Sequence, residues 1–134
     1  MSARENVLQA IVAALSTVTP SVYRSRVVAL TRGELPAVVV TPESEDTEQL
    51  ARALTSRRLT IKVAVHARGD IPDQAVDTLV GNLHAALLAD DTLGGKCARI
   101  VEGGTSWEFS DADGTALEMT ISYTATYSTP TNKI

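Results

Sequence analysis

The sequence is poor in cysteine, histidine and aromatic residues, and these shortages exclude several classes of protein. Its 134 residues include one cysteine, one tryptophan and one phenylalanine. The single cysteine, Cys97, cannot form an internal disulfide and stands in no metal-ligand spacing, which favours a reducing compartment and a core position. No apolar run approaches the ~18 residues that a membrane-spanning helix needs. Residues 1–20 are amphipathic, which favours a mature helix over a signal peptide, so we expect a cytoplasmic protein that enters no membrane.

Basic charge is in deficit as well. Sixteen acidic side chains stand against twelve basic ones, which gives a net charge of -4. This balance argues against nucleic acid as the main partner, because nucleic-acid-binding domains carry an excess of Lys and Arg. The remaining candidates for the main binding partner are another protein and a small ligand. The length is that of one domain, which buries roughly two thirds of the surface of its unfolded chain.

Catalytic and metal-binding motifs are absent from the sequence. It contains no G-x-S-x-G, no phosphate-binding glycine loop and no H-E-x-x-H. His66 is expected at the end of a strand on its polar face, and His84 on a helix beside the core stripe. Neither histidine has a further metal ligand or an orienting carboxylate at a characteristic spacing in the sequence. We therefore favour the interpretation that both are surface histidines without a catalytic or metal-binding role. We therefore assign no catalytic residue, metal ligand or cofactor, and we do not expect an enzyme.

The acidic stretch at residues 111–114, DADG, raises the question of a calcium loop. Counted from its first Asp, an EF-hand would have its fifth position at Thr115 and would need Gly at the position of Ala116 and Glu at the position of Ser122, so the spacing excludes this site. The β-patterned segments on both sides favour a hairpin turn. Trp107 and Phe109 share one face of the strand before this turn. A core position is favoured for both, with a partner contact as the alternative.

Two segments have the periodicity of amphipathic helices. The first begins with Ser2 and Glu5 as a capping box and ends before Pro20. The second begins with Asp70 as N-cap and Pro72 in its first turn. Each has one apolar stripe, formed by Val7, Leu8, Ile11, Val12 and Leu15 in the first helix and by Val76, Leu79, Val80, Leu83 and Leu87 in the second.

The remaining apolar segments are patterned as strands. They lie at residues 22–30, 35–40, 59–65, 97–101, 105–109 and 115–127. The segment 59–65 alternates without a fault, so the sheet should have one polar face. Gly103 and Gly104 are interpreted as a turn, so that the C-terminal third forms two successive hairpins. The order of elements predicts a single α+β domain over residues 1–134, with one mostly antiparallel β-sheet and two main helices packed on one face.

The charged segment at residues 41–58 is acidic in its first half and basic in its second. It could form a short helix with a Glu48/Arg52 pair, or remain a mobile loop. Its few apolar residues favour the mobile loop.

Three stretches together resemble a known family. They are ELPAVVV at residues 34–40, the run from Leu59 to Gly95, and the run from Gly103 to Tyr127 with its acidic hairpin and Thr/Tyr-rich final strand. In order and pattern they resemble the tail terminator proteins of long-tailed phages, the minor tail protein U family of lambda-like phages, over nearly the whole chain. The resemblance implies an α+β subunit that forms a hexameric ring on the end of the growing tail tube. Such a ring would stop tube polymerisation and present the surface to which the filled head joins.

The same resemblance implies the partners and the location. The partners would be further copies of this chain, the tail tube protein and a head–tail connector protein, while DNA would pass through the ring without specific binding. The protein would belong to a phage or prophage, lying in the bacterial cytoplasm during assembly and in the virion tail afterwards. As interface residues we single out the charges of the 41–58 segment and one aromatic side chain: Glu43, Glu45, Asp46, Glu48, Arg57, Arg58 and Trp107.

Two alternatives stay open at this point. A head–tail neck or adaptor protein would keep the assembly class and change the partner. A small-ligand-binding or hydrolytic domain would instead use the polar face of the sheet, with His66 and Asp70 as its polar groups.

Overall fold

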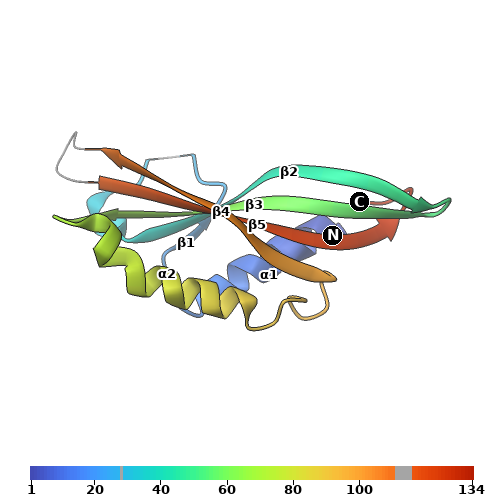
Figure 1. Cartoon of the computed structure of the whole chain (residues 1–134), viewed down its shortest axis with the longest axis horizontal. Coiled ribbons are helices and arrows are strands. Elements are labelled where there is room, and N and C mark those ends of the chain that lie inside the picture. The colour runs from blue at the N-terminus through green and yellow to red at the C-terminus, as the bar shows by residue number, and fades with distance from the viewer. Residues whose placement is uncertain (28, 111–115) are drawn as a thin grey trace.

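A computed structural model describes residues 1–27, 29–110 and 116–134, which form one sheet with helices along one side (Figure 1). The five strands lie in the order β1-β2-β3-β5-β4. Their bounds are β1 Val22–Arg24, β2 Ala37–Ala51, β3 Leu54–Arg68, β4 Arg99–Ser110 and β5 Ala116–Pro130. The helices are α1 Ala3–Ser16, α2 Pro72–Leu88 and the short 3-10 helix η1 Arg32–Glu34. Only the β1–β2 pair is parallel among the strand pairs of these residues, so the predicted α+β class is confirmed.

The helix starts follow from local chemistry. The hydroxyl of Ser2 accepts a hydrogen bond from the backbone N–H of Glu5, which satisfies one free donor of α1 and confirms the predicted cap. The Glu5 carboxylate does not close the capping box on the backbone but binds Arg24 of β1. The prediction of Asp70 as the cap of α2 was wrong. Ile71 occupies that position without a side-chain cap, because Pro72 already begins the helix with its fixed φ.

The core lies between the helices and one face of the sheet. The predicted alternation of β3 is confirmed, since Leu59, Ile61, Val63 and Val65 are all buried. Apolar residues of α1 and α2 pack against this face, and the aromatic ring of Tyr123 on β5 is among the largest buried groups. Neither α1 nor α2 lies on the opposite face of the sheet (Figure 1). We call it the open face.

The charged segment 41–58, predicted as a mobile loop or a short helix, is the distal half of a β-hairpin. Residues 41–51 continue β2, and β3 begins at Leu54. The prediction was wrong because it required apolar residues in the segment. β3 lies between β2 and β5, so its backbone groups have partners on both sides whatever its side chains are.

Two further strand predictions need correction. The strand expected over residues 22–30 ends at Arg24. The pair Gly103 and Gly104 is a bulge inside the continuous strand β4, where the register shifts between Glu102 and Thr105. A side chain at Gly103 would approach the Ser122 carbonyl to 3.3 Å, so glycine permits the close approach of β5.

The predicted turn at residues 111–114 lies outside the described residues. The strands on either side of it pair antiparallel, with Ser110 opposite Ala116.

Burial of the α1 stripe generates a test of the packing. Ile11 is buried in the core, whereas Gln9 on the same helix is exposed. Replacing Ile11→Ala removes buried methyl groups and leaves a cavity, so we expect the free energy of unfolding to fall by about 3 kcal/mol. Urea denaturation of the variant measures this, with Gln9→Ala as the matched control. Equal urea midpoints for the two variants would contradict the packing of α1 on the sheet.

Candidate interaction site

The distal end of the sheet extends beyond the helices (Figure 1). We define the arm as residues 43–58, the part of β2 and β3 that carries the charged segment. Glu43, Asp46, Glu48 and Arg58 are exposed on it, as their proposed role as partner contacts requires.

The side chains of the arm divide between the two faces of the sheet. Asp46 is paired with Arg58, and both lie on the open face. Glu45 is paired with Leu59 and therefore lies on the helix side. A bulge causes this, since the register of β2 shifts between Pro42 and Ser44 and thereby reverses which residues point inward. A proline inside a strand pattern is a sequence signal for such a bulge, and it could have located Glu45.

Glu45 lies at the centre of a polar network, with its side chain 10% exposed. Its carboxylate accepts hydrogen bonds from Arg4 of α1 and from the hydroxyl of Tyr127 on β5. Arg57 Nη1 lies 3.3 Å from the same carboxylate. Burial by itself would raise the pKa of Glu45, but the hydrogen bonds from Arg4 and Tyr127 outweigh it and hold the pKa below its usual value. Burial, followed by the Glu45 hydrogen bond, raises the pKa of Tyr127 to about 12.

Arg57 extends the network to the end of the chain. Its Nε donates to Thr129 Oγ1 at 2.9 Å, and its Nη2 donates to the carbonyl of Lys133 at 3.1 Å. The backbone N–H of Ala3 donates to the carbonyl of Ile134 at 3.1 Å. Glu45 and Arg57 were selected as partner contacts, but their side chains are used inside the subunit. The pair fixes the arm to α1 and to the C-terminal residues.

Trp107 and Phe109 are exposed on the outer strand of the sheet, with 52% and 57% of their surface accessible. The favoured prediction of core positions was therefore wrong. They do lie on the helix side, opposite Met119 and Leu117. Because β4 is the last strand in the sheet order, its side chains have neighbours on one side only. The alternative, a contact with a partner, remains for both rings.

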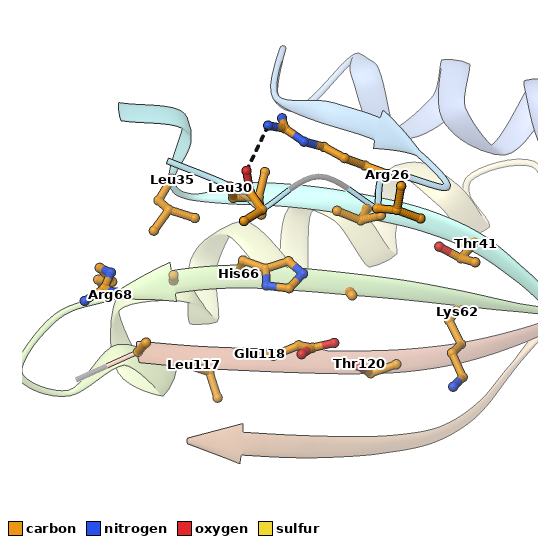
Figure 2. Close-up of a pocket in the computed structure, with 16 residues that line it drawn as sticks. Arg26, Leu30, Leu35, Thr41, Lys62, His66, Arg68, Leu117, Glu118 and Thr120 are labelled. Carbon is orange, nitrogen blue, oxygen red and sulfur yellow. Dashed lines mark hydrogen bonds between the residues drawn. The ribbon is translucent and has the colours of Figure 1, made fainter. Parts of the chain in front are cut away.

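The open face carries a hollow of about 630 Å³ beneath the segment that joins β1 to β2. Figure 2 shows His66 near its centre, between Leu30 above and Glu118 on the neighbouring strand. His66 is paired with Glu118 in the register of β3 and β5. Asp70 does not line this hollow. The ligand-binding alternative thus has a cavity of suitable size, but it lacks the His66/Asp70 combination that it proposed.

The charges around this hollow are partly neutralised within the subunit. Lys62 Nζ lies 3.5 Å from Glu43 Oε1. Arg26 is held by Glu34, with Nη2 3.0 Å from Oε1, and it stacks over the ring of Tyr23 at 4.6 Å. The hydrogen bond from Arg26 thereby lowers the pKa of Glu34 to about 2.

The His84 side chain makes contacts within the subunit that a histidine exposed on the surface would lack. Its Nδ1 lies 2.8 Å from the hydroxyl of the buried Tyr123 and 4.0 Å from Glu102 Oε2. Burial, and to a lesser degree the Glu102 charge, raises the pKa of Tyr123 to about 12. Tyr123 therefore stays protonated at neutral pH, which suits a structural hydrogen bond between α2 and β5.

Within residues 1–27, 29–110 and 116–134, no group of three or more His, Cys, Asp or Glu side chains is arranged to hold a metal ion. No helix in the same ranges combines the length and the apolar character needed to cross a membrane. The sequence matches no protein-family model and no curated protein. Inferences about function therefore rest on the sequence pattern and on the structure.

The buried carboxylate of the arm generates a pH-dependent prediction. We expect Glu45→Gln to lower the free energy of unfolding by about 3 kcal/mol at pH 7, because it leaves Arg4 and Arg57 without a buried counter-charge. A carboxylate with a lowered pKa stabilises the fold above its unfolded pKa, and this stabilisation is lost as the pH falls through the folded value. The difference between wild type and variant should therefore shrink below about pH 4.

Urea denaturation between pH 7 and pH 3 measures this difference. The control is Asp46→Asn, which changes the neighbouring exposed carboxylate and should shift stability by less than about 0.5 kcal/mol. A pH-independent gap between Glu45→Gln and wild type would show that the carboxylate charge is not what stabilises the arm.

Proposed function

We propose that this protein is a structural subunit that caps the tail tube of a long-tailed phage as a ring, ends tube polymerisation and forms the surface that joins the head. Support comes first from the sequence resemblance to tail terminator proteins. Structural support comes from one observation: the sheet ends in two unlike edges, both of which leave backbone groups without a neighbouring strand.

The two edges are β4 on one side and the β1–β2 side on the other. Among the strands of the described residues, β4 pairs with β5 alone. On the opposite side β1 covers only Val38–Val40, so no strand of the described part of the chain pairs with the outer edge of β2 at residues 41–51. Unpaired strand edges are templates for association with another chain. When one edge meets a different edge of the next copy, the contact is heterologous and closes into a ring if the rotation between copies permits.

The proposal includes the partners that this role requires. The ring would consist of six copies and bind the tail tube protein on one side and a head–tail connector protein on the other. DNA would pass through its channel without sequence-specific contacts, in agreement with the net charge of -4. The protein would lie in the host cytoplasm before assembly and in the virion tail after it.

Sedimentation velocity over a range of protein and salt concentrations tests this proposal. We expect a discrete species of about six chains and no larger species, because a closed ring has no free edge to extend. Electron microscopy of that species should show a ring with a central channel. A continuous ladder of masses would indicate an open polymer, and a monomer under all conditions would indicate no self-association; either result would contradict a self-assembling cap.

A further inference from the structure

The register of the sheet places one row of side chains from the β1 edge to the β4 edge on the helix side. Trp107 is opposite Met119, Met119 is opposite Val65, and the row ends through Val38 at Val22 of β1. Every member of this row is apolar. At the β4 end Trp107 is 52% exposed, and at the β1 end Val22 is only partly buried. The row therefore presents an apolar side chain at each edge of the sheet.

A second row crosses the open face further along the strands. Arg99 of β4 is opposite Thr126, Thr126 is opposite Arg58, and Arg58 is opposite Asp46 of β2. Arg99 and Asp46 are both exposed. Neither forms an ion pair with another described residue. This row ends in a cation at one edge of the sheet and in an anion at the other.

Strand direction is compatible with side-by-side addition of identical subunits. From β2 through β3 and β5 to β4 each neighbour is antiparallel, so β4 runs opposite to β2, and β1 is parallel to β2. A second copy in the same orientation thus brings its β1 and β2 antiparallel to β4. This is the arrangement in which two edges can share backbone hydrogen bonds directly.

We propose that the β4 edge of one copy binds the β1–β2 edge of a second copy, with Arg99 against Asp46 and Trp107 against the Val22 end of β1. The inference rests on the ring assembly proposed above and specifies its subunit contact. The apolar pair supplies area removed from water, and the charge pair fixes the register between the two copies. The partner is a second copy because the complementary groups stand at opposite ends of the same rows.

Two of the rows that lie between the apolar row and the charged row are compatible with the same contact. The row that contains Val101 ends at Ser44, and the row that contains Glu102 ends at Pro42. Neither brings like charges together across the contact. Two rows beyond Asp46 on the same face, Glu48 is opposite Ser56 and that residue is opposite Ser128, which has no partner among the described residues of β4. Glu48 therefore lies past the end of the proposed contact.

Charge exchange between the two edges tests the inference. Arg99→Asp and Asp46→Arg should each weaken self-association at least about tenfold, measured as a shift of the monomer–oligomer midpoint in sedimentation velocity. The double variant Arg99→Asp/Asp46→Arg restores an opposite-charge pair at the same contact, and its midpoint should return close to that of the wild type. Trp107→Ala should weaken association without rescue by either charge variant.

Glu48→Arg is the control, because it makes the same charge reversal on the same strand and face as Asp46 but beyond the proposed contact. Glu48 was singled out above from the sequence as a partner contact, and this subunit contact does not include it. Circular dichroism melts of all variants verify that the monomers are folded. A discrete assembly that is insensitive to both single reversals would overturn this contact and leave the ring proposal intact. Rescue by the double variant in an open polymer would support the contact and overturn the capping function. A monomeric wild type would overturn both.

Discussion

One largely buried carboxylate, that of Glu45, connects the arm to the rest of the fold. Glu45 joins α1 through Arg4, β3 through Arg57 and β5 through Tyr127, so one side chain connects three parts of the fold. Taking a carboxylate out of water costs several kcal/mol, and only a full set of hydrogen bonds from charged and polar groups offsets that cost. Because this set is present, a segment with few apolar residues can continue as a strand beyond the helices. The sheet is thereby longer than the helices that cover it, and the added length of β2 forms a free edge.

Sequence patterns predicted the parts of the fold whose signal is local. The period of two in β3 and the helical stripes of α1 and α2 identified most of the core residues, because residues that share one buried face recur at a regular spacing in the sequence. Val12, Leu79 and Val80 of the predicted stripes are only partly buried. The arm was missed because its stability comes from distant partners. The bulge after Pro42 turns Glu45 inward, and Arg4 and Tyr127, which meet it there, are 41 and 82 positions away in the chain. Contacts between residues so far apart in the chain leave no periodic pattern in the sequence.

For the candidate site, the sequence predicted which residues share a face of a strand better than it predicted their surroundings. Alternation placed Trp107 and Phe109 on one face of a strand, and that is where they lie, but exposure depends on which strand is outermost. Sheet order is a property of the whole chain. The charges of 41–58 were likewise selected as one group, whereas the pleat separates them into Glu45, which stays inside, and Asp46, which faces outward. Neighbouring acids in a strand therefore point to opposite faces of the sheet.

The free strand edges bear on the closed assembly that we propose. An unprotected edge invites indiscriminate pairing, and charged residues or proline on it reduce that hazard. The β2 edge carries Pro42, Glu43 and Asp46, so this guarded edge should reject most strands, and the β4 edge carries its own charges, Arg99, Glu102 and Glu108, beside the exposed Trp107. If the guarded edge accepts only a strand with a cation in register, each copy has one specific partner on each side. Closure into a ring then leaves no edge of either kind exposed, which is the same solution that a β-barrel reaches within one chain.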